Sequence, residues 1–289
     1  MEAILKRAYR TGATPFWVCQ ADPRFSYCLY VPEGARPSRP LPLIVVVHGS
    51  YRVPEAYRDR FAKFAEDNGC VVLCPLFPCG IVEPEDTESY KFVYSDHVPA
   101  YGGRGVRYDQ VLLSMVSEAS ERFGCDGRRF HLAGYSGGGQ FANRFFYGHP
   151  DRLLSVSIGA PGNVTLLDPS KGWFVGIGGM EAFLGKAPDL AAMRQVAVHM
   201  VVGEQDLDPS EVVSRPGSPH NIPGINDTGS DRVTRLRALE ANLRGAGLNV
   251  RFDLVPEVAH NGFAVLPAVF EFLAPLLAQH AHPTAGAFA

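Results

Sequence analysis

Six continuous apolar runs, each bounded by turn-forming residues, constrain the fold of this chain more than any other feature. Such runs are typical of strands that are covered on both faces, as in a parallel sheet. Between the runs, apolar residues recur at helical spacing. Strands that alternate with helices predict an α/β fold with a mostly parallel sheet. The six runs read LPLIVVVHG, CVVLCPLFP, RRFHLAGYS, RLLSVSIGAPG, AVHMVVGEQD and NVRFDLVPE.

The segments between the runs complete this architecture. Their spacing predicts helices over residues 54–68, 108–123, 138–147 and 231–244, and a buried terminal helix over residues 263–278. Residues 25–31 predict an earlier antiparallel strand. Three stretches, 79–107, 162–195 and 207–230, interrupt the alternation, and long excursions of this kind are commonly lids or binding loops. Because no repeat or linker divides the sequence, we expect residues 1–289 to form a single domain.

The composition argues against several classes of partner. Of 289 residues, 46% are hydrophobic and 20% are charged, and the formal net charge is −3, as in an ordinary soluble protein. No run of Lys and Arg suggests nucleic-acid binding, no apolar stretch is long enough to span a bilayer, and the first residues lack the apolar region of a secretory signal. We therefore expect a cytoplasmic protein that binds neither nucleic acid nor membrane. No pattern predicts an oligomeric state.

The cysteines give no sign of a metal site. They lie at positions 19, 28, 70, 74, 79 and 125, without a CxxC pair or histidines at zinc-finger spacing. Since no secretory signal is apparent, we expect reduced, partly buried thiols rather than disulfides.

The stretch Gly134-Tyr135-Ser136-Gly137-Gly138 carries the strongest catalytic signal. It follows an apolar strand and opens a helical segment, which is the setting of a nucleophile elbow. Side chains at Gly134 and Gly138 would collide with neighbouring backbone in so tight a turn, and Ser136 is expected to be strained, with its Oγ clear of the sheet. The N–H of Gly137, at the start of a helix, can stabilise an oxyanion.

A serine nucleophile needs a base and a group that orients this base. Among nine histidines we predict His260, because it follows the last apolar run and precedes the terminal helix. We predict Asp206 as the acid, because it falls where the run AVHMVVGEQD has just turned outward. Glu204 and Asp208 are close rivals, and Glu257 is a weaker one. The order serine, aspartate, histidine is expected of this elbow type.

A second oxyanion donor is expected after the strand LPLIVVV, which leads into His48-Gly49-Ser50-Tyr51. A backbone N–H just beyond such a strand can point toward the elbow, and either Ser50 or Tyr51 would supply it. His48 then fixes the loop rather than acting as the base. An ordinary turn at the end of the strand is the alternative.

Several aromatic residues lie in the three interruptions, where they can either line a substrate pocket or pack a lid. Lid packing with incidental substrate contact is the interpretation that we favour, because aromatic side chains are what a small lid uses to close over a core. The candidate substrate contacts are Tyr101, Trp173 and Phe174 in these stretches, together with Tyr135 at the elbow.

Taken together, HGSY after a strand, GYSGGGQFANRF at the elbow, VVGEQD and VAHNGF resemble the α/β-hydrolase superfamily over about residues 27–277. QFANRFFYGHPDRL and GRGVRYDQ further resemble the branch of serine esterases related to polyhydroxybutyrate depolymerases and feruloyl esterases. The resemblance implies an eight-stranded, mostly parallel sheet, with Ser136, Asp206 and His260 meeting at its carboxyl edge, and no cofactor. Secreted members of that branch carry signals and disulfides. This chain shows neither, which favours a small intracellular ester over a polymer.

The sequence therefore predicts a serine hydrolase that cleaves a carboxylic ester of a small molecule through an acyl-enzyme intermediate. A serine peptidase, an amide or thioester hydrolase, or an acyltransferase would use the same triad. A non-catalytic ligand-binding protein on this fold is the remaining alternative, although it would have no need for all three residues.

Overall fold

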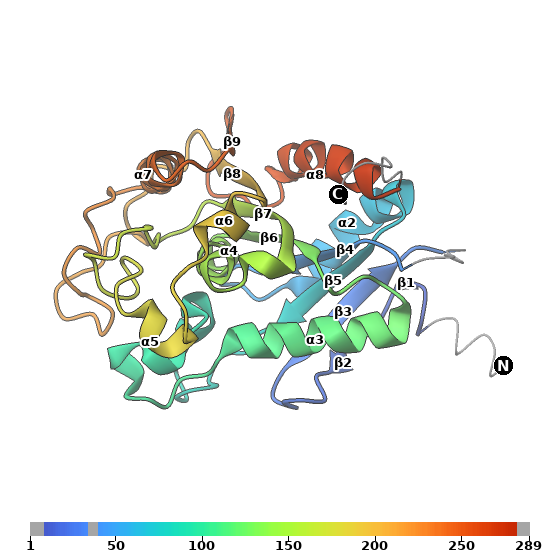
Figure 1. The fold of residues 1–289 in the computed structure, drawn as a ribbon, viewed down its shortest axis with the longest axis horizontal. Helices are drawn as coiled ribbons and strands as arrows, with labels where there is room; N and C mark the ends of the chain where they lie inside the picture. Colours follow the sequence, from blue (N-terminus) through green and yellow to red (C-terminus); the bar gives the residue numbers. More distant parts are fainter. Residues whose placement is uncertain (1–8, 34–39, 282–289) are drawn as a thin grey trace.

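The protein is built around one mixed sheet (Figure 1). The computed structural model describes residues 9–33 and 40–281. Within these residues, eight strands form one row in the order β1-β3-β5-β4-β6-β7-β8-β9, and the short β2 pairs with β3. The strands are β1 (Gly12–Ala13), β2 (Trp17–Val18), β3 (Ser26–Val31), β4 (Leu43–Val47), β5 (Val71–Leu76), β6 (Phe130–Tyr135), β7 (Leu153–Gly159), β8 (Ala197–Gly203) and β9 (Val250–Val255).

The strand directions confirm the predicted mostly parallel sheet. From β5 to β9 all neighbouring strands run parallel, whereas β3 runs antiparallel to β5 and pairs antiparallel with β1 and β2. The central strands β4 and β6 are buried along their whole length, as strands covered on both faces should be. The two-residue strands β1 and β2 are too short to produce an apolar run, so the sequence pattern does not reveal them.

Helices cover both faces of the sheet. The long ones are α2 (Pro54–Asn68), α3 (Tyr108–Phe123), α4 (Gly137–Gly148), α7 (Arg232–Gly245) and α8 (Leu266–Ala281). The crossover that contains α2 runs across the sheet in one direction, and the crossovers that contain α3, α4 and α7 run in the other. Because crossovers between parallel strands are right-handed, α2 lies on the opposite face of the sheet from α3, α4 and α7. The terminal helix α8 joins α2 on its face, where the rings of Phe64 and Phe270 stack 4.6 Å apart (Figure 1).

The helix boundaries agree closely with the sequence pattern. Both α2 and α3 span the predicted residues, α4 extends one residue further at each end, and α7 is displaced by one residue. The terminal helix begins three residues later than expected. There, the side chain of Asn261 accepts hydrogen bonds from the N–H groups of Phe263 and Ala264, which holds these residues in a turn before α8. Among the described residues, no helix is both long and apolar enough to cross a bilayer.

The three interruptions follow β5, β7 and β8, so all of them emerge from the carboxyl ends of parallel strands. The first contains the 3₁₀ turns η1 (Ser89–Phe92), η2 (Ser95–His97) and η3 (Pro99–Tyr101), and the second contains the short helices α5 (Met180–Leu184) and α6 (Leu190–Met193). They pack on one another through aromatic contacts. Phe92 and Phe174 have ring centroids 4.4 Å apart, and Phe92 and His220 are 4.9 Å apart.

The strand order places a natural ligand site at the ends of β4 and β6. From β4 the chain crosses to β5 on one side, and from β5 it returns to β6 on the other side of β4. In open α/β sheets, ligands bind in the crevice outside the carboxyl ends of strands at such a reversal of direction. The elbow serine follows β6, and the His48 loop follows β4, so both meet at this point.

Candidate active site

Ser136 occupies the sharp turn between β6 and α4. Its backbone has φ 57° and ψ −115°, a region that residues with a side chain rarely adopt. The N–H of Ser136 donates to the carbonyl of Gly159, at 2.8 Å, which fixes the turn against β7. A Cβ at Gly134 would overlap the carbonyl of Gly138, and one at Gly138 would overlap the carbonyl of Val47. The predicted need for glycine at both positions is confirmed.

Ser136, His260 and Asp206 form one line of hydrogen bonds, although they come from three separate strand ends. Nε2 of His260 lies 3.0 Å from Oγ of Ser136, and Nδ1 lies 2.6 Å from Oδ2 of Asp206. Because a carboxylate only accepts hydrogen bonds, Nδ1 carries the proton of the neutral ring and Nε2 is left as an acceptor. The imidazole is thus oriented to receive the hydroxyl proton of Ser136.

Asp206 is the carboxylate that reaches the histidine, and its rivals do not. Its side chain is fully buried. Glu204 is exposed and accepts from the backbone N–H of Glu257, at 3.3 Å, and Asp208 is an exposed residue that accepts from the backbone N–H of Ser210. Asp206 alone of these three residues contacts the imidazole, and its backbone N–H donates to the carbonyl of Gly203 in the turn after β8.

Two further side chains contact the Asp206 carboxylate. The hydroxyl of Tyr135 donates to Oδ2 at 3.4 Å, and the guanidinium of Arg232 lies 3.4 Å from Oδ1. Burial, together with the nearby carboxylate, raises the pKa of Tyr135, so this phenol stays protonated and remains a donor. Tyr135 was predicted as a substrate contact, but the structure places it behind the histidine. Arg232 was not predicted.

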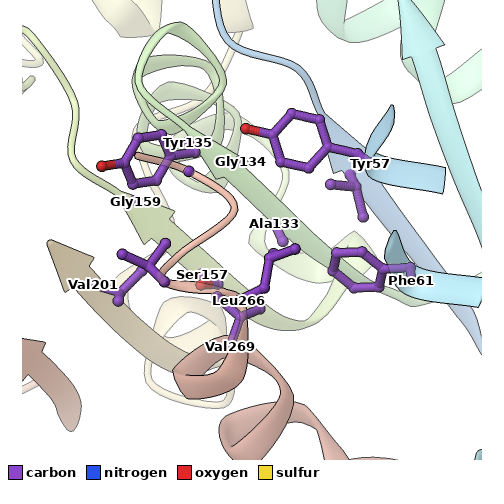
Figure 2. A pocket seen from close by; sticks show the side chains of 13 residues that line it. Tyr57, Phe61, Ala133, Gly134, Tyr135, Ser157, Gly159, Val201, Leu266 and Val269 are labelled. Atoms are coloured by element: carbon purple, nitrogen blue, oxygen red, sulfur yellow. The ribbon is translucent and has the colours of Figure 1, made fainter. Parts of the chain in front are cut away.

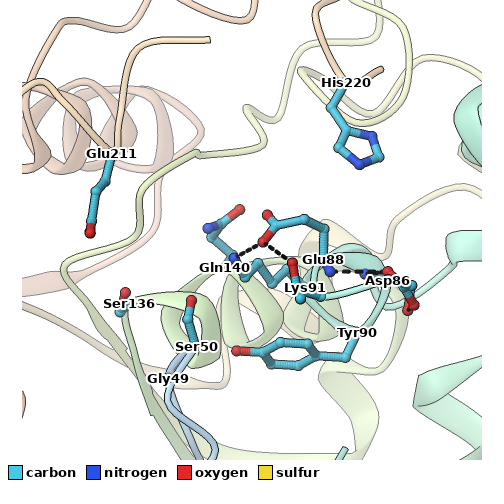
Figure 3. A network of polar contacts seen from close by, with 12 residues as sticks. Gly49, Ser50, Asp86, Glu88, Tyr90, Lys91, Ser136, Gln140, Glu211 and His220 are labelled. Carbon is cyan, nitrogen blue, oxygen red and sulfur yellow. Dashed lines mark hydrogen bonds and ion pairs between the residues drawn. The ribbon is translucent and has the colours of Figure 1, made fainter. Parts of the chain in front are cut away.

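The loop after β4 approaches the elbow closely. The carbonyl of Gly49 accepts from the N–H of Arg52, at 3.1 Å, and lies 2.8 Å from Nδ1 of His48. The Gly49 carbonyl and the N–H of Ser50 belong to one trans peptide, in which they point in opposite directions. Because Arg52 and His48 hold the carbonyl, the N–H of Ser50 points away from both of these residues. Ser50 lies near Ser136 (Figure 3). Tyr51, the next residue of the loop, is 90% exposed.

His48 acts inside the loop and not as a base. Its ring is fully buried, and Nε2 accepts a hydrogen bond from the backbone N–H of Phe77, at 3.0 Å. Burial lowers the pKa of His48 to about 3, so the ring is neutral at physiological pH. A neutral ring with Nδ1–H directed at the Gly49 carbonyl ties the end of β4 to the end of β5.

The aromatic candidates lie mainly within the packing of the interruptions. Trp173 packs against Tyr94, with ring centroids 5.5 Å apart, and Phe174 packs against Phe92. Both Trp173 and Phe174 are buried. Tyr101 lies 3.3 Å from Asp86 and 3.4 Å from His220 through its hydroxyl, and it lines a polar cavity of about 220 Å³.

That cavity has a strongly polar lining. One of its lining residues, Glu88, connects it to the elbow by way of Lys91. Lys91 is buried, its side-chain stem lies near Gly137, and its ammonium forms an ion pair with Glu88 at 2.5 Å. Figure 3 shows this pair near Ser50 and Ser136. Sequence reasoning missed the pair, although Lys91 in an aromatic stretch was a visible signal. The cavity is lined by Glu83, Glu85, Asp86, Thr87, Glu88, Ala100, Tyr101, Pro219 and His220.

A second cavity lies behind the elbow, and it is small and apolar. Its volume is about 20 Å³, about that of one water molecule. Tyr135 and Tyr57 line it together with Leu266 and Val269 of α8 (Figure 2). A space of this size is a packing gap that leaves no room for a substrate. Within residues 9–33 and 40–281, no three His, Cys, Asp or Glu side chains are grouped so as to hold a metal ion.

Comparisons with known proteins identify the fold. No protein-family model matches the sequence, and no curated protein matches it. Among solved structures, LpqC, a poly(3-hydroxybutyrate) depolymerase from Bordetella parapertussis, is 24% identical with a TM-score of 0.70, and the match covers 95% of this chain and 96% of that one. Poly(aspartic acid) hydrolase-1 from Sphingomonas sp. KT-1 is 20% identical with a TM-score of 0.67, over 91% and 98% of the two chains.

A ferulic acid esterase is 13% identical with a TM-score of 0.59, over 92% of this chain and 99% of that one. Depolymerases and feruloyl esterases are also the proteins that the sequence motifs of this chain resemble. At these identities the likeness is one of fold, and it extends over nearly the whole length of each chain. The chain has the α/β-hydrolase fold.

Proposed function

We propose that this protein is a serine hydrolase that cleaves a carboxylic ester of a small molecule through an acyl-enzyme intermediate. The observation that carries the proposal is the line of contacts from Ser136 through His260 to Asp206, with distances of 3.0 and 2.6 Å. A serine on a nucleophile elbow, with a base and a buried carboxylate in this order, is the arrangement used for acyl transfer. The similar structures named above are a depolymerase, a hydrolase and an esterase, which supports hydrolysis.

In the first half-reaction, Oγ of Ser136 attacks the ester carbonyl while Nε2 of His260 takes the hydroxyl proton. The carbonyl π electrons move onto its oxygen, which becomes an oxyanion. Asp206 stabilises the imidazolium that forms. When the tetrahedral intermediate collapses, the C–O bond to the alcohol breaks, His260 gives its proton to the departing oxygen, and the acyl group remains on Ser136.

The backbone N–H of Gly137 and that of Ser50 or Tyr51 would hold the oxyanion. Gly137 is the first residue of α4, so its N–H lies at the positive end of the helix dipole. Ser50 follows a peptide whose carbonyl is held by Arg52 and His48, and the fixed peptide keeps its N–H in place before substrate arrives. Donors that need no reorganisation are the effective ones.

In the second half-reaction, His260 takes a proton from water, which attacks the acyl carbonyl, and the acid is released as the proton returns to Ser136. An alcohol or amine that replaced water would make the same site an acyltransferase. The polar surroundings of Ser136, with Lys91, Glu88 and Ser50 close by, favour a short or polar acyl group over a long alkyl chain.

The decisive experiment is a stopped-flow assay with p-nitrophenyl acetate on the native protein, Ser136→Ala and Ser50→Ala, at matched fold by circular dichroism. We expect a burst of about one equivalent of p-nitrophenol in the native protein and none in Ser136→Ala. Ser50→Ala keeps its backbone N–H and is expected to keep the burst. A burst that survives in Ser136→Ala would overturn the proposal, as would failure of a fluorophosphonate to label Ser136 in the native protein.

A further inference from the structure

Arg232 is a buried cation placed between the carboxylate of the site and the surface. Its side chain is only 5% exposed, and its two terminal nitrogens bind different carboxylates. One lies 3.4 Å from Oδ1 of Asp206, and the other lies 3.2 Å from Oε2 of Glu211. Glu211 is 72% exposed, so the chain of contacts runs from solvent through Arg232 and Asp206 to the histidine.

This placement goes against the local preferences of the helix that bears it. Arg232 is the first residue of α7, whose N-cap Asp231 accepts from the N–H of Thr234. A cation is unfavourable at the positive end of a helix dipole, and burying a guanidinium is costly unless it is paired. Its Nε is buried and lacks a hydrogen-bond partner within the described residues. Residues that break local rules in this way are expected where function requires them.

The two oxygens of Asp206 are used differently. Oδ2 faces the imidazole and the hydroxyl of Tyr135, whereas Oδ1 faces Arg232. Contacts on both oxygens fix the plane of the carboxylate and therefore the ring that it orients. The titratable and charged groups around this carboxylate come from five segments of the chain: Tyr135 at the end of β6, Tyr57 in α2, His260 before α8, Asp208 and Glu211 in the loop after β8, and Arg232 and Arg235 in α7.

We propose that Arg232 is a positioning residue that holds the Asp206 carboxylate and, by its charge, sets how readily His260 takes up a proton, with Glu211 moderating that charge from the surface. The inference rests on the proposed function of Ser136, His260 and Asp206. It assigns a role to a residue that touches neither the substrate nor the reacting atoms.

Arg232 and Glu211 carry opposite charges, so their removal is expected to shift the protonation of His260 in opposite directions. Loss of the Arg232 charge leaves Asp206 uncompensated, so the imidazolium is stabilised and the ring takes up its proton at higher pH. Loss of the Glu211 charge leaves Arg232 facing Asp206 alone, so the imidazolium is destabilised and the ring takes up its proton at lower pH. A packing role would give no such opposite shifts.

The test is an NMR titration of ¹⁵N-histidine-labelled protein, in which the resonances of His260 are assigned by their loss in His260→Gln. The variants are Arg232→Gln, Arg232→Lys, Glu211→Gln and the control Arg237→Gln, another arginine of α7 that pairs with Glu240 instead. We expect the midpoint of the His260 titration to rise by about 0.5 to 1 pH unit in Arg232→Gln and to fall by a few tenths in Glu211→Gln. Arg232→Lys, which keeps the charge, and Arg237→Gln should leave it nearly unchanged.

Equal midpoints in all variants, or shifts of the same sign in Arg232→Gln and Glu211→Gln, would overturn the inference. Glu211 is at the surface, so its variant is expected to fold even where Arg232→Gln does not. The NMR titration needs no turnover and is therefore independent of the proposed function. If the native protein hydrolyses p-nitrophenyl acetate, the acid limb of kcat/KM should move with the same signs. A protein that shows the NMR shifts without turnover would contradict the proposed function alone.

Discussion

The α-carbon of Gly134 faces the carbonyl group of Gly138 so closely that a methyl group on Gly134 would overlap it. Ser136 lies between these glycines with a positive φ of 57°. The end of β6 and the start of α4 are thus folded against each other, and the position of the Ser136 side chain depends on that contact. A small change in backbone path here would move Oγ away from His260.

Gly134→Ala is therefore expected to lower kcat/KM for p-nitrophenyl acetate by about 100-fold or more, because a displacement of the nucleophile by about 1 Å has an effect of this size. It should also lower the free energy of unfolding by about 1 to 3 kcal/mol, as is usual for an overpacked site. Urea denaturation and steady-state kinetics measure the two effects. Gly245→Ala is the matched control, because a Cβ at this helical residue would meet no neighbour within 4 Å. Equal losses in the two variants would contradict this account of the elbow.

The contacts of Asp206 predict a second pair of variants. Its bond to Nδ1 of His260 is 2.6 Å long, whereas the hydroxyl of Tyr135 lies at 3.4 Å. Asp206→Asn replaces an acceptor with an amide that favours the wrong tautomer of the ring, and we expect kcat to fall by about 10⁴-fold. Tyr135→Phe removes only the longer contact and should change kcat less than about tenfold. If Tyr135→Phe lowered kcat as much as Asp206→Asn, the inference from these distances that Asp206 and not Tyr135 orients the ring would be wrong.

The fold and the line of contacts at Ser136 could be predicted because each depends on short-range patterns. Apolar runs mark strands buried on both faces, and glycine spacing marks the elbow. Asp206 and His260 were found from their positions after two such strands, since the carboxyl ends of parallel strands meet at one edge. His48 was predicted to fix its loop, and its bonds to Gly49 and Phe77 show this role.

The surroundings of the site could not be predicted, because they depend on contacts between distant segments. Arg232 reaches Asp206 from a helix that begins 26 residues later. Lys91 approaches Gly137 from the loop after β5, and no spacing in the sequence relates these two positions. Tyr135 was placed on the substrate side, but the alternation of side chains along β6 directs its ring behind the histidine. Long loops are positioned by such tertiary contacts and not by periodicity.

The buried ring of His48 predicts a loss of stability in acid. Because the folded protein holds the pKa of His48 at about 3 and an unfolded chain has about 6.5, unfolding takes up a proton between these two values. The stabilisation is complete above pH 6.5 and is lost as the pH falls toward 3. At pH 4 the native state should have lost about 3 kcal/mol from this group alone.

Urea denaturation of the native protein and of His48→Gln, at pH 7 and at pH 4, tests this expectation. Glutamine does not titrate, so the variant should be less stable at pH 7 but should lose less stability on acidification. The buried His199, whose pKa burial lowers to about 4, contributes to the acid loss in both proteins and cancels in the comparison. Identical acid losses in the two proteins would contradict the assignment of this term to His48.

The six cysteines predict a simple pattern of thiol reactivity. All of them are free, and Cys79 alone is exposed while the other five are buried. Burial raises the pKa of Cys28 and Cys70 to about 12 and that of Cys125 to about 11, so these side chains carry almost no thiolate at pH 8. We expect Ellman's reagent to modify one thiol rapidly in the native protein and the other five only after unfolding in guanidinium.

Cys79→Ser should abolish the rapid phase and leave five thiols to react after unfolding, whereas Cys125→Ser should leave the rapid phase intact. Since Cys79 follows β5 at the start of the first interruption, its reactivity also reports on whether that segment stays packed. Cys28 of β3 and Cys74 of β5 lie side by side within the sheet. If more than one thiol reacted rapidly in the native protein, a buried strand such as one of these two would have to open on the time scale of the assay. A single rapid equivalent that vanishes with Cys79 would instead show that the sheet stays closed around its thiols.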